Sequence, residues 1–185
     1  MRIEVKEREK SFFDECLYIT NFFPRVLRKP NKKVMSATRA FLRTLIGYLI
    51  YTIIFIFIGI NDNFDTLTVI FLVIFLLFGL LCFIYFLNVK KQIKFYMNDD
   101  GKSSFFEINE DGVKVESYIG TSSLLKWDLV KYIIINKETI SFLPDKISVT
   151  SVVLFVSTKY KDEVVNAIKK YNKEELIIDN SELYK

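Results

Sequence analysis

Two long apolar stretches dominate the hydrophobic pattern of this chain. Residues 44–60 read TLIGYLIYTIIFIFIGI and residues 67–87 read LTVIFLVIFLLFGLLCFIYFL, and neither contains a charged side chain. A helix rises ~1.5 Å per residue, so the second stretch spans a hydrocarbon core of ~30 Å, and the first does so once residues 42–43 are added. Only the polar turn NDNFDT separates them. The pattern therefore predicts an antiparallel transmembrane hairpin with spans at about 42–60 and 67–87.

The apolar stretches 44–60 and 67–87 carry no Asp, Glu, Lys or Arg. Channels and transporters usually place charged residues or broken helices at their working sites, so this hairpin is typical of an anchor. A pore formed by a homo-oligomer stays open as an alternative. The glycines of the spans, however, form no G-x-x-x-G pair; they are Gly47, Gly59 and Gly79.

Basic residues flank the hairpin on both sides. No Asp or Glu occurs between Cys16 and Asn61, whereas the turn between the spans carries Asp62 and Asp65 and no Lys or Arg. By the positive-inside rule we expect a multi-pass protein with both termini in the cytoplasm. The wealth of Lys, Asn, Ile and Phe is typical of an AT-rich bacterial genome, which predicts the bacterial inner membrane. The flanking residues, which also attract anionic lipid head groups, are Arg25, Arg28, Lys29, Lys32, Lys33, Arg39, Arg43, Lys90 and Lys91.

The region before the hairpin has its own pattern. Alternation in RIEVK predicts a strand over residues 2–6, and SFFDECLYITNFF at 11–23 places apolar residues on one face of a helix. Ser11 and Asp14 resemble a capping pair, and Pro24 is expected to end the helix. Two roles stay open for the aromatic face of this helix: it packs on the C-terminal domain, or it lies on the lipid surface.

After the hairpin the hydrophobic period changes from helical to alternating. The step Asn-Glu-Asp-Gly at 109–112 predicts a β-hairpin turn. Residues 159–171 predict an amphipathic helix with Tyr160, Val164 and Ile168 on one face. The expected strands are 104–109, 113–117, 123–127, 132–136, 139–143 and 149–157.

These elements predict a membrane α+β fold. Several antiparallel strands closed by one C-terminal helix form a small β half-barrel, which is the pleckstrin-homology-like architecture. The expected regions are a cytoplasmic strand, amphipathic helix and basic linker at 1–40, the transmembrane hairpin at 41–89, and the cytoplasmic half-barrel with its C-terminal helix and tail at 90–185.

Trp127 and Asp128 form the most distinctive pair of neighbours. The main interpretation is structural: Trp127 fills the domain core against the C-terminal helix, and Asp128 caps the next turn. The alternative is that both contribute to a contact or pocket for a small molecule.

Catalytic patterns are missing from the sequence. The chain contains no His, and its two cysteines, Cys16 and Cys82, lie far apart. Catalytic triads with His and His-bound zinc are therefore excluded. Walker loops and G-x-S-x-G elbows are excluded because their sequence patterns do not occur. We expect no enzyme activity, cofactor or metal. Aromatic residues do not interleave with the basic ones as a stacking platform requires, so we expect no nucleic acid polymer as a partner.

Two segments resemble a known bacterial family, the YcxB-like membrane proteins. They are FFEINEDGV at 105–113 and LKWDLV at 125–130. The order of an N-terminal strand and helix, a membrane hairpin with basic flanks and a strand domain is also similar. The resemblance implies the pleckstrin-homology-like fold and the membrane location, and it supplies no established reaction.

Two functions remain after these exclusions. The first is a non-enzymatic inner-membrane binding or regulatory protein, with an immunity-type role among the options, whose cytoplasmic domain engages a protein partner or lipid head groups. The alternative is a ligand-gated membrane effector in which the β domain senses a cyclic nucleotide. Against the alternative, the strand region holds scattered lysines but no Arg, the preferred bidentate ligand of phosphate.

Overall fold

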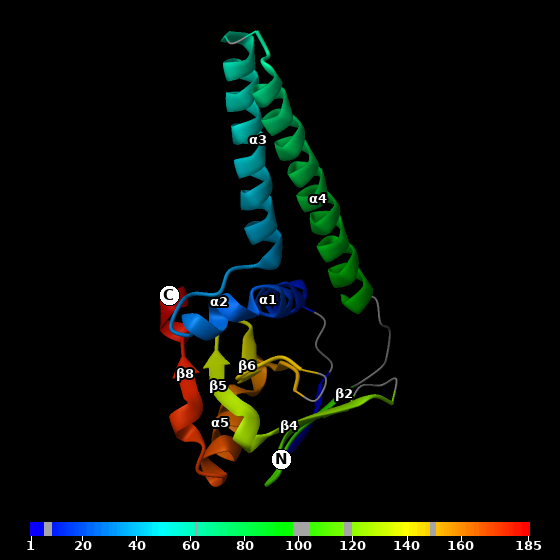
Figure 1. Ribbon diagram of the computed structural model, residues 1–185. Helices are drawn as coiled ribbons and strands as arrows, with labels where there is room; N and C mark the ends of the chain where they lie inside the picture. Colours follow the sequence, from blue (N-terminus) through cyan, green and yellow to red (C-terminus); the bar gives the residue numbers. More distant parts are fainter. Residues whose placement is uncertain (6–8, 62, 98–103, 117–119, 149–150) are drawn as a thin grey trace. The chain divides into compact units, whose positions relative to one another are not determined.

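The computed structural model describes residues 1–5, 9–61, 63–97, 104–116, 120–148 and 151–185 (Figure 1). The chain divides into two compact units. One unit combines residues 1–34 with residues 96–185, and the other comprises residues 35–95. We call them the domain and the hairpin and describe each by itself.

The hairpin consists of two long helices, α3 (Ala37–Asn61) and α4 (Thr66–Met97), which run antiparallel side by side (Figure 1). Both are long and apolar enough to cross a membrane, which confirms the two expected helices. Each helix extends beyond its expected span. The Ser36 hydroxyl accepts a hydrogen bond from the Arg39 amide at 3.1 Å and caps α3, and α4 continues through a polar segment without a helix breaker.

The turn between the helices is held by two local contacts. Asp65 Oδ1 accepts a hydrogen bond from the Thr68 amide at 2.8 Å and so caps α4. The Phe64 amide donates to Gly59 O at 2.7 Å, and the ring then covers Gly59. A Cβ atom on Gly59 would lie 2.5 Å from Phe64 Cε1, so a larger residue here would have to displace the Phe64 ring. Asp62, also expected in the turn, lies outside the described residues.

Aromatic rings line the contact between α3 and α4. Phe55 stacks on Phe71 and Phe75, with centroid distances of 5.8 and 4.9 Å. Tyr51 stacks on Phe75 at 5.7 Å. These offset pairs hold the two helices together without any charged side chain.

The domain contains two four-stranded sheets, and the first is antiparallel throughout. The N-terminal strand pairs with the strand that follows the hairpin, with Ile3 opposite Phe106. The β2–β3 turn forms where the Asp-Gly step predicts it, because Asn109 Oδ1 accepts from the Asp111 and Gly112 amides at 3.0 and 3.1 Å. The strands, in spatial order, are β1 (Arg2–Val5), β2 (Ser104–Ile108), β3 (Gly112–Glu116) and β4 (Ser122–Lys126).

The second sheet is mixed. Its strands, in spatial order, are β7 (Leu154–Ser157), β6 (Thr139–Pro144), β5 (Val130–Ile135) and β8 (Ile177–Asp179). The strand β8 runs parallel to β5, while the other pairs are antiparallel. The sequence pattern did not predict β8.

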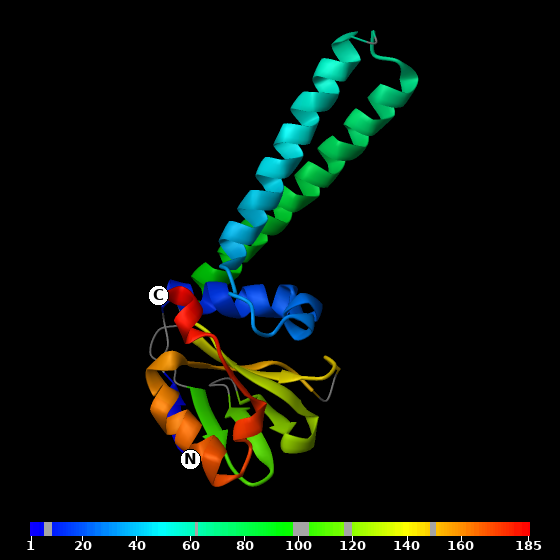
Figure 2. The same cartoon turned by 90° about the vertical axis from the view of Figure 1, so that its left-hand side faces the viewer.

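Within the described residues, three α-helices and four 3₁₀ turns complete the domain, which Figure 2 shows from a second side. The helices are α1 (Lys10–Asn21), α2 (Phe23–Arg28) and α5 (Lys161–Lys170). The turns are η1 (Trp127–Leu129), η2 (Thr158–Tyr160), η3 (Glu174–Leu176) and η4 (Ser181–Tyr184). The apolar face of α5 joins residues of both sheets in one core, whose fully buried members include Ile108, Leu125, Phe142, Val156, Val164 and Ile168. Two long apolar helices followed by antiparallel and mixed sheets and a C-terminal helix thus confirm the α+β layout.

Two local expectations at the N-terminal helices are corrected. Glu9, not Ser11, is the N-cap of α1, and no side chain caps it. Pro24 follows the end of α1 but does not stop the chain from being helical. It occupies the first turn of α2, where a missing amide proton costs nothing.

Two strand expectations are also corrected. The expected strand at 123–127 ends at Lys126, because Trp127 begins the 3₁₀ turn η1. The expected long strand at 149–157 reduces to β7, preceded by an isolated bridge between Ser148 and Ser151; residues 149–150 lie outside the described part.

Candidate functional site

The hairpin exposes nearly all of its large apolar side chains. Phe57 is 66% exposed, and Leu67 and Leu81 are each 61% exposed. Contiguous apolar surface of this extent is not stable in water, since each Å² costs roughly 25 cal/mol, and it marks a membrane or partner contact. The helices therefore need an apolar environment around them.

Charge separates the two ends of the hairpin. Because α3 and α4 are antiparallel, the start of α3 and the end of α4 lie at one end, and the turn lies at the other. The turn end carries Asp65. The basic residues at the open end are all exposed: Arg39, Arg43, Lys90, Lys91 and Lys94.

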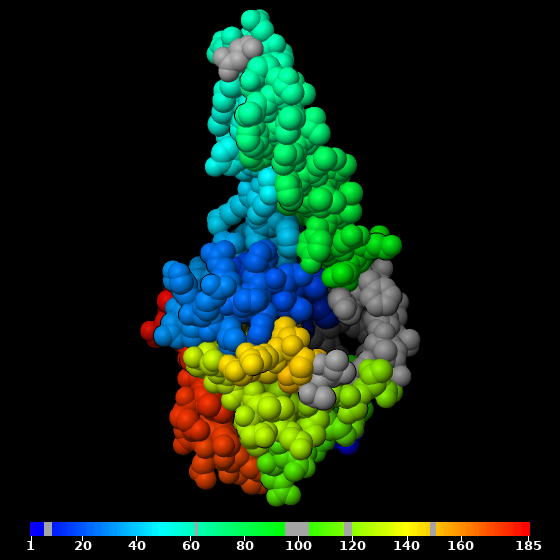
Figure 3. Space-filling view, viewed as in Figure 1, coloured from blue at the N-terminus to red at the C-terminus, as the bar shows by residue number. Residues whose placement is uncertain are grey.

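A second group of cations lies on the domain, on α2 and the segment after it. We call residues 29–34 the linker, because the hairpin follows it in the chain. Phe23 and Val26 are buried and fix α2 on the domain, so the cations of this region remain outside. Figure 3 shows α1 and α2, in blue, on the surface of the domain. The five exposed cations form no ion pair with a described acidic residue; they are Arg25, Arg28, Lys29, Lys32 and Lys33.

The C-terminal segment, residues 177–185, holds the linker by its backbone. Asn180 is buried, and its Nδ2 donates to Pro30 O at 2.8 Å. The Tyr184 hydroxyl accepts from the Val34 amide at 2.9 Å and donates to Val34 O at 3.2 Å. Lys33 Nζ lies 4.9 Å from the Tyr184 ring centroid. The linker is thus fixed at both ends, and Figure 2 shows the C-terminal segment, in red, beside α2.

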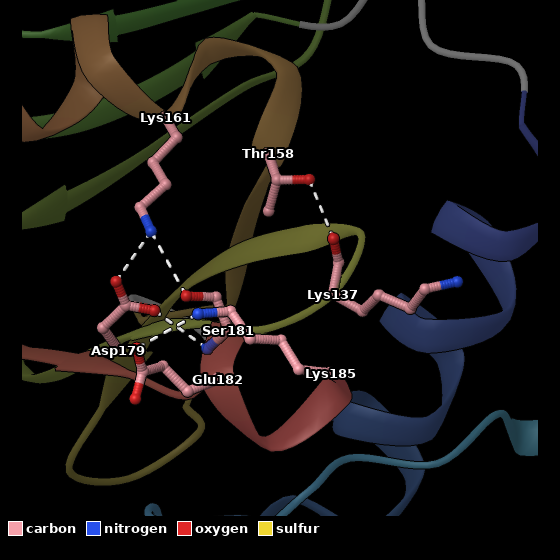
Figure 4. A network of polar contacts seen from close by, with 7 residues as sticks. All are labelled: Lys137, Thr158, Lys161, Asp179, Ser181, Glu182 and Lys185. Carbon is pink, nitrogen blue, oxygen red and sulfur yellow. Dashed lines mark hydrogen bonds and ion pairs between the residues drawn. The ribbon is translucent and has the colours of Figure 1, made fainter.

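The same segment is fastened to the domain. Besides the β5–β8 pairing, the Asn180 amide donates to Ile135 O at 2.8 Å. Lys161 Nζ on α5 reaches Asp179 Oδ2 at 2.7 Å and Ser181 Oγ at 3.4 Å (Figure 4). Partial burial acts to raise the pKa of Asp179, but the hydrogen bonds from Lys161 and Ser181 outweigh it and hold the pKa below its ordinary range. Asp179 therefore stays ionised and paired.

Glu15 is the most perturbed acid of the domain. It lies on α1, is only 5% exposed, and its Oε2 accepts from the Glu138 amide at 2.8 Å. Among the described residues no donor is in hydrogen-bonding geometry to Oε1. Burial raises the pKa of Glu15 to about 7, and the nearby Glu138 charge adds to this; backbone amides of the β5–β6 turn and the Thr139 hydroxyl only partly oppose it.

The surroundings of Glu15 are polar but contain few hydrogen-bond donors among the described residues. Asn136, in the β5–β6 turn, is 1% exposed, and its Oδ1 has no donor among the described residues. Its Nδ2 lies 3.5 Å from Thr139 Oγ1. Burial, followed by the negative charge of Glu15, raises the pKa of Tyr184, so these two side chains are neighbours. The helix α1, the β5–β6 turn and the C-terminal segment therefore meet around one carboxyl group.

Sequence reasoning missed Glu15, although a signal for it existed. Glu15 follows Phe12 by three residues and precedes Ile19 by four, and both of these are buried. An acid at these spacings shares the buried face of the helix. The helix α1 contacts β6. Its buried residues are Phe12, Asp14, Glu15, Tyr18 and Ile19, so the packed face differs from the aromatic face that the sequence pattern predicted.

Trp127 lies in the domain core. It is 8% exposed, belongs to the cluster that contains Val164 and Ile168, and its Nε1 donates to Asn109 O at 2.9 Å. Asp128, by contrast, is exposed and sits inside η1, whose N-cap is Lys126, so it is neither a core residue nor the expected cap.

The other acids of the first sheet serve structural pairs. Glu116 accepts from Lys114 Nζ at 2.5 Å and from Arg2 Nη2 at 3.0 Å, and these contacts lower its pKa. No group of three or more Cys, Asp or Glu side chains suited to a metal ion occurs in the part of the chain that the structure describes.

Comparison with known proteins gives no relative: no family model, no curated protein and no solved structure matches this chain.

Proposed function

We propose that this protein is a non-enzymatic binding protein of the bacterial inner membrane. The hairpin α3–α4 anchors it, and the domain lies in the cytoplasm together with both termini. The observation that carries the proposal is the exposed apolar surface of the hairpin, with basic side chains at its open end and an acid at its turn. Positively charged flanks stay on the cytoplasmic side during insertion, which supports this orientation.

Anionic lipid head groups are the proposed ligands of the second cation group. Five exposed cations without a described acidic partner lie on α2 and the linker. Each contributes roughly 1 kcal/mol of attraction when it is close to an anionic surface. This contribution requires the linker to stay near the membrane, and its direct continuation into α3 supports that.

The domain is proposed to be of the pleckstrin-homology-like class, within a YcxB-like protein, and to bind a protein partner. Two sheets closed by the amphipathic α5 support this class. Four large apolar side chains among the described residues of the domain are exposed outside its core: Leu124 at 38%, Leu129 at 40%, Leu183 at 45% and Ile147 at 49%. Leu124 lies on β4, the last strand of its sheet, and such a strand presents backbone groups to which a partner strand can add.

In-cell photo-cross-linking of the full-length protein tests this proposal. A photoreactive amino acid at Leu124, and in a second variant at Leu129, should give a discrete cross-linked protein band. The same amino acid at Glu163, exposed on the outer face of α5, is the matched control and should not give that band. The absence of a discrete band at both leucines would contradict the protein-binding proposal. Saturable binding of a cyclic dinucleotide by the full-length protein in nanodiscs would instead favour a ligand-gated effector.

A further inference from the structure

The last residues of the chain hold the backbone that leads into the first helix of the hairpin. The hold consists of Asn180 on Pro30 O and of Tyr184 on both polar backbone atoms of Val34. Two residues after Val34, Ser36 caps α3. The segment is fastened to β5 and, through Lys161, to α5 (Figure 4). It is therefore a strap between the sheet of the domain and the linker.

The proton of the Tyr184 hydroxyl has two competing acceptors. In the structure it is donated to Val34 O at 3.2 Å. The second acceptor is the carboxyl of Glu15, whose charge acts directly on the Tyr184 hydroxyl and whose Oε1 has no donor in hydrogen-bonding geometry among the described residues. A hydroxyl has only one proton to donate, so it serves either the linker or the carboxylate.

Groups from every packed element face this carboxyl. On α1 itself, Asp14 is the adjacent buried acid. On the β5–β6 turn, Glu138 adds negative charge and is paired with Lys137 at 3.0 Å. From the C-terminal segment comes Tyr184, and Lys33 of the linker lies over the ring of that tyrosine. The charge that acts on Glu15 is thus the negative one of Glu138, which is itself paired with Lys137.

We propose that Glu15 is a proton-binding site whose occupancy sets the hold of the C-terminal strap on the linker. When Glu15 carries a proton it needs no further donor, Tyr184 donates to Val34 O, and the strap is closed. When that proton leaves to bulk water, the carboxylate accepts the Tyr184 proton and the bond to Val34 O is lost. The Tyr184 oxygen still accepts from the Val34 amide, so the linker is held by one bond fewer and the strap opens more often. Only O–H bonds form and break in this exchange.

The protonation of Glu15 changes within a physiological pH range. Burial brings the pKa of Glu15 to about 7, so its protonation state changes across the pH of a bacterial cytoplasm. The consequence for the membrane rests on the proposed function, because the linker transmits strain to α3 only if the hairpin is anchored. The strap itself belongs wholly to the domain and can be tested separately.

Hydrogen exchange of the full-length protein in nanodiscs, read by mass spectrometry on peptides that cover residues 30–36, tests the proposal. The measured quantity is the protection factor, which corrects for the chemical pH dependence of exchange. Between about pH 6 and about pH 8 the ionised fraction of a group with this pKa rises from roughly 10% to roughly 90%. We expect the protection of the Val34 amide to fall about tenfold over this range in the wild type.

Two variants and one control make the result decisive. Glu15→Gln, which cannot ionise, should keep the high protection at both pH values. Tyr184→Phe, which lacks the acceptor for the Val34 amide, should show low protection at both. Glu163→Gln on α5 should behave as the wild type, and a blue-shifted Trp127 emission verifies that each variant is folded.

An unchanged protection factor in the wild type, or an equal fall in Glu15→Gln, would overturn the proposal. Labelling of the hairpin turn from outside the cell is read on the same variants. A correct topology together with a flat exchange profile would remove the strap and leave the membrane anchoring intact.

Discussion

The hairpin and the domain differ in how their apolar side chains are kept away from water. In the domain, residues such as Ile108, Phe142 and Ile168 are fully buried against one another. In the hairpin, residues such as Phe57 and Leu81 remain more than half exposed, and aromatic pairs join the two helices. The domain is therefore stabilised by its own packing, whereas the hairpin depends on its surroundings. Mutations should affect each unit separately.

The largest effect that is confined to one unit is expected at Trp127. The change Trp127→Ala removes a buried ring and its hydrogen bond to Asn109 O, and should destabilise the domain by about 3–5 kcal/mol. The hairpin should stay inserted. Limited proteolysis of membranes measures the first effect, and resistance to alkaline extraction measures the second. Trp127→Phe, which keeps most of the apolar contact, is the matched control, and loss of insertion in Trp127→Ala would show that the two units are not independent.

The complementary change acts on the hairpin. Ile74 lies near the middle of the expected span 67–87 and is exposed, so Ile74→Arg should hinder insertion by about 2.5–3.5 kcal/mol, while Ile74→Leu should be neutral. The measurement is the fraction of the protein that integrates into membranes during synthesis. Normal integration of the arginine variant would mean that this face of α4 does not contact lipid.

Glu15 should give the domain a pH dependence that the hairpin lacks. Its pKa is about 7 in the folded protein against an ordinary 4.5, so between these pH values the folded state binds more protons than the unfolded state. Stability therefore falls as the pH rises from the lower to the higher value and is level above it, a loss of about 3 kcal/mol.

The substitution Glu15→Gln should remove this slope. Relative to the wild type, the variant should gain stability above pH 7 and match it near the ordinary pKa of a carboxyl group. Chemical unfolding at several pH values, followed by Trp127 fluorescence, provides the curve. A slope that persists in Glu15→Gln, or one that Glu163→Gln also abolishes, would disprove the assignment to Glu15.

A smaller effect is expected at the turn of the hairpin. A Cβ on Gly59 would meet the Phe64 ring at 2.5 Å, so Gly59→Ala should cost about 1–3 kcal/mol through overpacking. The double variant Gly59→Ala with Phe64→Ala should recover most of this cost, which thermal unfolding in detergent can resolve. Gly47, which has open space around its Cβ direction, is the control and should tolerate alanine. Equal costs at both glycines would refute the contact.

The same contrast explains what the sequence could predict. The hairpin was predictable because the length and apolar composition of each run indicate a membrane-spanning helix, whatever the run packs against. The strands β2, β3, β5 and β6 were predictable from alternation and from the Asp-Gly turn. The strand β8 was not, because it has three residues and exists through its pairing with β5, more than forty positions earlier.

The candidate site was harder to predict for the same reason. That Glu15 lies on the buried face of α1 follows from its spacing to Phe12 and Ile19. Its raised pKa, however, arises first from burial and then from the nearby charge of Glu138 in the β5–β6 turn, which lies far away in the sequence. Asp128 was singled out in the sequence because it follows Trp127. In the structure Trp127 is buried, but Asp128 is exposed.

Cysteine accessibility in intact cells tests the central claim, an anchored hairpin with the domain inside, most directly. The native Cys16 and Cys82 are replaced by Ala, and single cysteines are placed at Asn61 beside the turn or at Asn172 in the domain, both of which are exposed. A membrane-impermeant maleimide should label the cysteine at 61 in intact cells and the cysteine at 172 only after permeabilisation. Labelling of the cysteine at 172 in intact cells, with the cysteine at 61 protected, would contradict the account.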